Sequence, residues 1–373
     1  MSAPREQLPR VAVVGSGLLG TSVGLALREH GVEVILFDSD EGAVRLAAEL
    51  GAGVAGQPAG TTGPADLAVL AVPPAAVARV LLESQQRELA RVYTDVASVK
   101  STVVDAARAY GCDLSSFVAG HPMAGRERSG PAAARGDLFL GRPWVLCPTG
   151  GSSDTARTTV LALARACGAE PSELDAGDHD RAVAAVSHAP HLVAAVMAAQ
   201  LTEADEVALE LAGQGLRDAT RIAGGDPLLW AEILDANAPA VAGVIDGVAA
   251  DLTAAAAALR APAADHPGSD GPVTDREALI ELLRRGVAGR ARVPGKRGGP
   301  APSYAAVAVV VRDQPGELGR LLGVVGEIGV NVEDVALEHS PGLPVGVIEL
   351  SVRPDAADVL AEQLRQRGWS VHR

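Results

Sequence analysis

The chain has 373 residues, of which 48% are hydrophobic, so it is long enough for two or three domains with sizeable cores. Its formal net charge of −14 argues against general binding to nucleic acid or to an anionic membrane, and an anionic substrate would need a local cationic pocket. The three cysteines are far apart and have no metal or redox spacing. No signal peptide or membrane-spanning stretch is recognisable, so we expect reduced thiols in a cytoplasmic protein.

The first predicted element is a strand at Val11–Val14 that runs into a glycine-rich turn and a helix. The glycines have the spacing G-x-G-x-x-G, which is typical of a dinucleotide-binding unit when it lies between a strand and a helix. The first glycine turns the chain, the second lets the backbone approach a pyrophosphate, and the third lets helix and strand pack closely. Backbone N–H groups at the helix N-terminus then favour phosphate. The predicted cofactor contacts in this turn are Gly15, Ser16, Gly17, Leu18, Leu19 and Gly20.

Asp38 follows the second predicted strand, Glu33–Phe37. Its carboxylate can accept hydrogen bonds from a ribose diol and would repel a 2′-phosphate. The sequence therefore predicts NAD rather than NADP as the cofactor. The alternative is a glycine turn in an α/β domain that binds no nucleotide.

Strands and helices alternate up to about residue 148, which predicts a Rossmann-type α/β domain at residues 1–149 with a parallel sheet covered on both faces. Ligands bind such sheets at the carboxyl ends of the strands. Val72 and Pro73 lie at the end of the third strand and are predicted as further cofactor contacts. The remaining predicted strands are Leu67–Val72, Arg91–Val96, Ser116–Gly120 and Trp144–Cys147.

His121 follows the fifth predicted strand and precedes Pro122, which disfavours helical geometry at the residue before it. We therefore expect His121 on a loop at the strand end, beside the expected nicotinamide. A histidine there can act as a general base near neutral pH. The alternative is a hydrogen-bonded structural histidine, which its place at a strand end disfavours.

Ser98 and Lys100 follow the fourth predicted strand. The Ser98 hydroxyl either contacts the substrate or the cofactor carboxamide, or caps a helix predicted at Thr102–Tyr110. Lys100 either binds the substrate or orients Asp95.

From about residue 150 the pattern becomes almost entirely helical, which predicts an all-helical substrate and dimerisation domain at residues 150–290. Asp226-Pro227 marks one helix start, and Pro190 and Pro239 mark two more. The apolar helix Ala238–Leu259 has no polar stripe. We therefore expect it to be buried on most sides, with a subunit interface and a homodimer.

The segment Ser187-His188-Ala189-Pro190-His191 places two histidines three residues apart. No Cys, Asp or Glu at matching spacing completes a ligand set, so no metal site is predicted. We instead expect His191 in the first turn of a helix, where its ring donates a hydrogen bond to an anion.

Arg217 and Arg221 precede the helix start at Asp226. An arginine fork matches a carboxylate bidentately, so an arginine here is a candidate carboxylate clamp. The alternative is a surface ion pair, and it competes most strongly at Arg217.

Residues 291–302 are rich in glycine, proline and basic side chains, which predicts a linker. Residues 303–373 then follow the pattern βαββαβ, which predicts a separate α+β domain. Its predicted elements are Ala305–Val311, Glu317–Gly329, Val330–Leu337, Val345–Val352, Asp355–Gly368 and Trp369–Val371.

Five motifs, in this order and spacing, resemble the prephenate/arogenate dehydrogenases of tyrosine biosynthesis. They are Gly15-x-Gly17-x-x-Gly20, Asp95-Val-Ala-Ser98-Val-Lys100, Gly120-His121-Pro122-Met123-Ala124-Gly125-Arg126-Glu127, Ser187-His188-Ala-Pro190-His191 and Thr220-Arg221-Ile-Ala. The resemblance covers about Val11 to Arg290. It implies the NAD-dependent oxidative decarboxylation of prephenate to 4-hydroxyphenylpyruvate, or of arogenate to tyrosine.

The resemblance also implies roles for single residues. His121 would take the proton of the ring hydroxyl as hydride leaves the same carbon for NAD⁺, and Ser98 would contact that hydroxyl or the nicotinamide. Arg221 would bind a substrate carboxylate, and His191 and Glu127 would line or gate the pocket. Many members of the family have threonine where this chain has Arg126. Arg126 could therefore contact the substrate or a cofactor phosphate, or replace a gating contact.

Residues 304–371 resemble an ACT domain, a small regulatory module that often binds amino acids. The resemblance rests on Asp313-x-Pro315-Gly316-x-Leu318 and on Gly329-Val-Asn331. It implies feedback regulation by tyrosine or another amino acid through Asp313, Gly316, Leu318 and Asn331.

Two other functions stay open on the residues alone. Another two-domain, NAD-dependent hydroxy-acid dehydrogenase would usually use a lysine of the helical domain as acid and base, and Ala182–Arg260 contains no lysine. A non-catalytic regulator would bind NAD and an amino acid without turnover, and the presence of both His121 and Arg221 argues against it. Prephenate and arogenate differ by a keto group against an amine, and no single residue decides between them.

Overall fold

The fold is seen in a computed structural model that describes residues 8–56, 63–126, 128–260, 273–294, 304–339 and 344–372. The chain separates into two compact units, Met1–Ala249 and Ala250–Arg373. Each unit has its own sheet and its own hydrophobic core.

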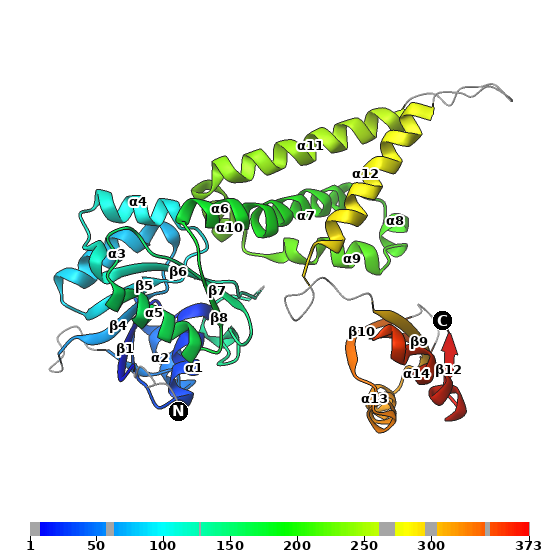
Figure 1. Ribbon diagram of the computed structural model, residues 1–373, viewed down its shortest axis with the longest axis horizontal. Helices are drawn as coiled ribbons and strands as arrows, with labels where there is room; N and C mark the ends of the chain where they lie inside the picture. Colours follow the sequence, from blue (N-terminus) through cyan, green and yellow to red (C-terminus); the bar gives the residue numbers. More distant parts are fainter. Residues whose placement is uncertain are drawn as a thin grey trace. The chain divides into compact units, whose positions relative to one another are not determined.

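The first unit is built on an eight-stranded sheet with the strand order β3-β2-β1-β4-β5-β6-β7-β8 (Figure 1). The predicted parallel sheet is confirmed, with one antiparallel pair, β6 and β7. Among the described residues between these two strands, the only helical element is a short 3₁₀ turn at Pro131–Ala133, whereas parallel neighbours usually need a crossover helix. The strands are β1 (Arg10–Val14), β2 (Glu33–Phe37), β3 (Val54–Ala55), β4 (Ala65–Leu70), β5 (Ala90–Asp95), β6 (Phe117–Pro122), β7 (Pro143–Cys147) and β8 (Glu170–Glu173).

Helices cover both faces of this sheet, as its apolar strands require. One face packs against α1 (Leu18–Glu29), α2 (Glu41–Glu49) and α5 (Asp154–Ala166), and the other packs against α3 (Pro74–Gln86) and α4 (Ser101–Ala109).

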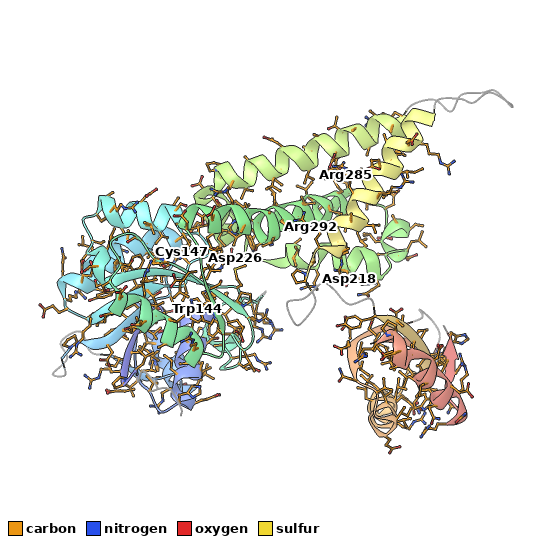
Figure 2. All side chains as sticks on the ribbon, viewed as in Figure 1. Trp144, Cys147, Asp218, Asp226, Arg285 and Arg292 are labelled. Carbon is orange, nitrogen blue, oxygen red and sulfur yellow. The ribbon has the colours of Figure 1, made fainter. Side chains whose placement is uncertain are left out.

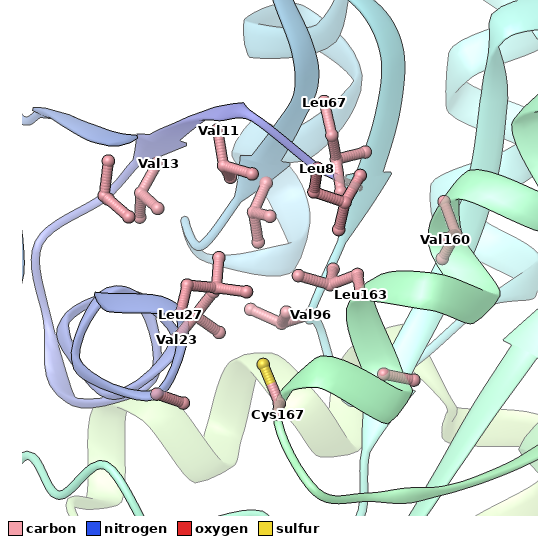
Figure 3. Packing of buried hydrophobic residues seen from close by; sticks show 14 of the residues in the cluster. Leu8, Val11, Val13, Val23, Leu27, Leu67, Val96, Val160, Leu163 and Cys167 are labelled. Carbon is pink, nitrogen blue, oxygen red and sulfur yellow. The ribbon is translucent and has the colours of Figure 1, made fainter. Parts of the chain in front are cut away.

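Strand β1 shows the alternation that links sequence to packing. Val11 and Val13 face α1, where they pack with Val23 and Leu27, while Ala12 belongs to the core on the opposite face (Figure 3). All five side chains are fully buried. Full burial stabilises a valine or leucine side chain by about 1.5–3 kcal/mol each, so β1 and α1 fix the start of the domain firmly.

A long helical stretch opens the second half of this unit. It comprises α6 (Ala176–Val183), a π-helical segment (Ala184–His188) and α7 (Ala189–Ala199). Pro190 lies in the first turn of α7, as predicted, but α7 continues a π-helical segment instead of following a loop. A proline inside a helix removes one hydrogen bond and clashes with the carbonyl four residues earlier, and a π turn is one way for a helix to accommodate such a disruption.

The other helices of this region are short, apart from α11. Asp226 caps α10 by accepting from the N–H of Leu228 at 2.9 Å, which confirms the predicted helix start. The remaining elements of the first unit are the 3₁₀ turns Leu114–Ser116, Gln200–Glu203 and Arg221–Gly224, and α8 (Glu206–Glu210), α9 (Gln214–Thr220) and α10 (Pro227–Ala236). Helix α11 (Ala238–Arg260) begins in the first unit and ends in the second.

Helix α11 is apolar but is not buried within a single chain, which leaves the predicted subunit interface as the partner that could cover it. Val241 is its only buried residue, whereas Leu252 and Leu259 are more than half exposed. In the part of the chain that the structure describes, Ala238–Arg260 and Ala176–Glu203 are the two helices long and apolar enough to cross a membrane by length and composition. The second of them carries buried ionisable side chains, namely His179, Asp180 and His188.

The second unit contains α12 (Val273–Ala291) and a four-stranded antiparallel sheet of order β10-β11-β9-β12. Its elements follow the predicted βαββαβ order, with one core formed by the sheet and two helices. They are β9 (Ala305–Arg312), α13 (Glu317–Ile328), β10 (Val332–His339), β11 (Val345–Val352), α14 (Pro354–Gln366) and β12 (Ser370–His372).

Candidate active site

The glycine turn lies at the point where the strand order of the sheet reverses, because β1 has β2 on one side and β4 on the other. Gly15 has φ +104°, and a Cβ there would lie 2.2 Å from the carbonyl oxygen of Ala71 after β4. A Cβ on Gly20 would lie 1.9 Å from the carbonyl oxygen of Gly15. A Cβ on Gly17 would meet no atom within 4 Å. The first and third glycines are therefore needed for packing, and the second leaves open space at the N-terminus of α1.

Asp38 lies directly after β2, as predicted, and its carboxylate is held in place. The N–H of Ser16 donates to its Oδ2 at 2.6 Å, and the N–H of Asp40 donates to its Oδ1 at 3.0 Å. Val72 and Pro73 follow β4 at the same edge of the sheet, since β4 ends at Leu70. An open glycine turn, free helix N–H groups and a fixed carboxylate fit a dinucleotide with an unmodified ribose.

His121 is placed three strands away from β1 along the same edge, in β6. With about 4.8 Å between neighbouring strands, this separation is roughly 14 Å, a span that an extended dinucleotide can bridge. The prediction that His121 lies on a loop was wrong, because β6 continues through it to Pro122 and pairs it with Val145 of β7. A residue before proline favours extended geometry, which occurs in strands as well as in loops, so Pro122 is compatible with either position for His121.

The ring of His121 is buried and contacts a second histidine that the sequence analysis did not single out. Its Nδ1 lies 2.8 Å from Nε2 of His179 in α6, and Nδ1 of His179 lies 2.8 Å from Oδ1 of Asp180. His179 is 1% exposed and Asp180 is 5% exposed. The only sequence signal was a histidine flanked by acidic residues, which is too common to indicate a site.

Lys100 and Asp95 form an ion pair in which both side chains are fully buried. Lys100 Nζ also donates to the carbonyl oxygen of Gly120 at 2.7 Å, and the N–H of Gly120 donates to Asp95 Oδ1 at 3.1 Å. The pair therefore holds both backbone groups of the residue before His121. Of the two predicted roles for Lys100, the structure supports orientation of Asp95.

Ser98 lies between β5 and α4 and is half-buried, but it does not cap α4. The helix begins at Ser101, and a residue of α6 accepts the hydrogen bonds of the N–H groups at its start. The N–H groups of Lys100 and Ser101 each donate to the carboxylate of Asp180 at 2.8 Å. A cap supplied from 79 or 80 positions away in the sequence leaves the Ser98 hydroxyl available for a ligand.

Burial and local charge set the protonation states in this cluster. Burial lowers the pKa of His121 well below its ordinary value, and the positive charge of Lys100 and the neighbouring His179 and His188 lower it further. Burial works to raise the pKa of Asp180, but hydrogen bonds from His179 and from Ser101 and Lys100 overcome it and lower the pKa to about 2. His121 is therefore neutral and Asp180 is ionised at neutral pH.

His188 and His191 lie on the next turns of the same helical stretch. Asn237 Nδ2 donates to the carbonyl oxygen of Asp180 at 2.8 Å and lies 3.1 Å from Nδ1 of His188. Burial lowers the pKa of His188 to about 4. The ring of His191 stacks on Trp230 of α10 with centroids 3.5 Å apart, and burial lowers its pKa as well.

The predicted arginines are on the surface. Arg221 starts the 3₁₀ turn that packs against α7, the helix that carries His191. Arg217 is exposed in α9, where it reaches the carbonyl oxygen of Ala212 at 3.4 Å. Arg126 is exposed and donates to the carbonyl oxygen of Ala133 at 3.1 Å, which ties the segment after β6 to itself. Glu127 lies outside the described residues.

The described residues contain no group of three or more His, Cys, Asp or Glu side chains that could hold a metal ion. The three cysteines are free and buried. Cys147 lies in β7 (Figure 2), and burial raises its pKa to about 12.

Two family models match this chain. Residues 23–172 match the model described as "Prephenate dehydrogenase, nucleotide-binding domain", and residues 175–284 match "Prephenate dehydrogenase, dimerization domain". The chain belongs to the prephenate dehydrogenase family. In this prephenate dehydrogenase family member, His121 lies in the first matched region, whereas His179 and Asp180 lie in the second. The buried histidine pair therefore joins the two parts that define the family.

Individual proteins give the same result. The chain is 43% identical over 362 residues to the protein named "Probable prephenate dehydrogenase NovF" of Streptomyces niveus, across 96% of this chain and 98% of that protein. The solved structure of prephenate dehydrogenase from A. aeolicus with hydroxyphenyl propionate and NAD⁺ is 25% identical with a TM-score of 0.64, across 76% of this chain and 98% of that one. Synechocystis arogenate dehydrogenase is 26% identical with a TM-score of 0.60, across 75% and 98%.

Proposed function

We propose that this chain catalyses the NAD-dependent oxidative decarboxylation of prephenate to 4-hydroxyphenylpyruvate, with arogenate to tyrosine as the closely related alternative. The observation that carries the proposal is a buried, neutral His121 at the same sheet edge as a dinucleotide-binding turn, in a chain of the prephenate dehydrogenase family. A neutral imidazole in that place can accept the proton of a hydroxyl group.

The reaction needs one proton transfer and one hydride transfer. The bound NAD⁺ supplies the hydride acceptor. Nδ1 of His121 is already engaged with His179, so Nε2 is the ring nitrogen left to accept the proton of the substrate hydroxyl. Oxidation of the ring alcohol gives a cyclohexadienone, and loss of CO₂ then restores an aromatic ring. The protein therefore mainly has to place the reactants and hold the base ready.

The remaining predicted residues have proposed roles around this centre. Ser98 contacts the reacting hydroxyl or the nicotinamide, and Arg221 binds a substrate carboxylate as a bidentate clamp. His191 donates to the anionic side chain of the substrate. Arg126 and Glu127 are proposed at the entrance, where the family usually has threonine and glutamate.

One assay tests the proposal. The full chain is supplied with NAD⁺ and either prephenate or arogenate, and NADH is followed by its absorbance. We expect turnover with at least one of the two substrates, and much weaker turnover when NADP⁺ replaces NAD⁺ because Asp38 would repel the 2′-phosphate. Cofactor binding without turnover of either substrate would favour the non-catalytic regulator instead.

We also propose that residues 304–372 are an ACT-like regulatory unit that binds tyrosine or another amino acid. A pocket of about 150 Å³ opens beside the start of α13, and Asp313 and Leu318 are among its lining residues. Gly316 has φ +91° and lets the chain turn into α13, whereas Asn331 donates to Glu333 at 2.7 Å instead of lining the pocket. Arg312 and Glu317 in the same pocket offer both charges that an amino acid needs.

We also propose that the protein is a homodimer and is cytoplasmic; the exposed apolar face of α11 supports the homodimer. The residues of α11 fall within the region that matches the dimerization model of the family, and a dimer would cover Leu252 and Leu259. The molar mass in solution tests this proposal, since 37.8 kDa is expected for a monomer and twice that for a dimer. A monomer at micromolar concentration would contradict it.

A further inference from the structure

The contacts between His121, His179 and Asp180 form a series of two hydrogen bonds. Each bond is 2.8 Å long, and both are buried. The series starts at the proposed base and ends at a carboxylate in a different structural element, α6. Neither the cofactor turn nor the proposed carboxylate clamp requires this arrangement.

The protonation state of Asp180 determines which atom donates in each of the two hydrogen bonds. Asp180 is ionised, so its oxygens only accept. Nδ1 of His179 must therefore carry the proton that it donates to Asp180. In the neutral form of His179 the lone pair is on Nε2, which then accepts the proton on Nδ1 of His121. The lone pair of His121 is then on Nε2, the ring nitrogen that takes no part in these two hydrogen bonds.

We propose that His179 and Asp180 are positioning residues that fix His121 in the tautomer with a free Nε2, so that two residues of α6, in the region that matches the dimerization model, make the base competent. This inference rests on the proposed function, because it assigns the partners of the proposed base. Without His179, the Nδ1 proton of His121 would be buried with no acceptor, and the ring could turn or change tautomer.

The other charged groups around His121 do not replace this pair. Lys100 Nζ is engaged with Asp95 and with the carbonyl oxygen of Gly120, and His188 is engaged with Asn237. Lys100 adds positive charge that keeps the imidazole neutral, but a lysine has no acceptor for the Nδ1 proton. Asp180 also caps α4, so substitutions at His179 test the tautomer while leaving that cap in place.

The test compares His179→Gln with His179→Asn in the full chain. Glutamine places an amide oxygen near the former Nε2, where it can accept from His121, whereas asparagine is one methylene shorter and reaches only toward Asp180. We expect kcat to fall by about 100-fold in His179→Asn and distinctly less in His179→Gln, with NAD⁺ affinity and the melting temperature close to those of the wild type. Asp178→Asn, an exposed neighbour on the same helix, is the control and should keep kcat within about twofold.

A second measurement does not depend on turnover. Nitrogen-15 chemical shifts of histidine-labelled wild-type protein report which ring nitrogen carries the proton, and the His121 signals are assigned from the His121→Asn variant. We expect protonated Nδ1 in both His121 and His179. A protonated Nε2 in His121, or equal wild-type kcat in both His179 variants, would overturn the inference. Failure of the proposed function would look different, since the tautomers would be as expected while neither substrate was oxidised.

Discussion

The two ends of the candidate site are built from different parts of the chain. At the cofactor end, Gly15–Gly20 presents backbone N–H groups and open space, and Asp38 is its one predicted side-chain contact with a charge. At the other end, the buried groups include a lysine, two carboxylates and three histidines. These are Lys100, Asp95, Asp180, His121, His179 and His188.

Because of this difference, the two ends of the candidate site should be sensitive to different substitutions. A backbone-built site fails when a Cβ fills its space, but it tolerates changes in the side chains around it. A site built from buried polar side chains fails when one partner is removed, because the remaining group loses its hydrogen bond and stays away from water. The cofactor end should therefore be sensitive to added side-chain atoms, and the other end should be sensitive to the removal of a polar side chain.

The largest effect is expected at the proton-transfer end. We predict that His121→Asn lowers kcat by about 10²–10⁴, the usual loss when a general base is removed, with NAD⁺ affinity nearly unchanged. Steady-state kinetics and a direct cofactor titration measure both quantities. Turnover like that of the wild type would remove His121 from its proposed role.

The substrate clamp should show a smaller effect of a different type. We predict that Arg221→Ala raises KM for the anionic substrate by about 10–100-fold, the value of a charge-assisted hydrogen bond, and changes kcat less. Arg217→Ala, on the neighbouring exposed helix, is the matched control. If KM responded to Arg217 and not to Arg221, the clamp would belong to α9.

The cofactor end can be tested with two glycines that differ only in their surroundings. Gly20→Ala should lower the free energy of unfolding by about 1–3 kcal/mol, because its Cβ would collide with the Gly15 carbonyl oxygen. Gly17→Ala should leave stability nearly unchanged and raise KM for NAD⁺, because its Cβ would occupy the open space. Urea unfolding and NAD⁺ kinetics separate the two, and equal loss of stability would show that the turn is not built this way.

Acid should destabilise the side-chain end selectively. The pKa of His188 is about 4 in the folded chain against about 6.5 for an ordinary histidine, and that of His121 is also lowered. The unfolded chain therefore binds more protons below about pH 6.5, so stability is full above that pH and falls as pH decreases toward 4. We expect a loss of about 1 kcal/mol or more between pH 7.5 and 5 in urea unfolding.

A matched pair of variants identifies the groups responsible for this loss. His188→Gln should reduce the pH dependence of unfolding, while His30→Gln, at an exposed position, should leave it unchanged. A pH dependence identical in all three proteins would place the effect elsewhere.

The smallest effect on chemistry is expected from the tail. Deletion after Ala291 should leave kcat within about twofold, because the A. aeolicus structure corresponds to 76% of this chain and is itself covered almost completely. Any response to tyrosine should disappear with the tail. Inhibition by tyrosine that survived the deletion would instead show competition in the active site.

The sequence predicted the cofactor end more fully than the proton-transfer end, for a physical reason. The glycine turn is contiguous, and each glycine has a local steric purpose. His121 was also singled out as a candidate base, because the strand-end rule and Pro122 point to it. His179 was not, because its value depends on packing across 58 positions of the chain. No local pattern reports that α6 lies against β6.

Capping shows the same limit. A serine before a helix normally predicts a local cap, and Ser98 was considered for that role. In the folded chain Asp180 receives the N–H groups of α4 instead. The burial of α11 stays a prediction for a related reason, since an apolar sequence does not say whether its partner is the same chain or another copy.

The π-helical segment at Ala184–His188 has a consequence for the angular phase of the long helix that contains it. Each residue of an α-helix advances by about 100°, so twelve steps from His179 to His191 would place the two rings roughly 120° apart. A π turn uses one additional residue, and the effective eleven steps bring the same two positions to within roughly 20°. The extra residue therefore places the His191 ring on the side of the helix that carries His179. The number of residues between the two histidines sets the direction of the His191 side chain as well as its distance along the helix.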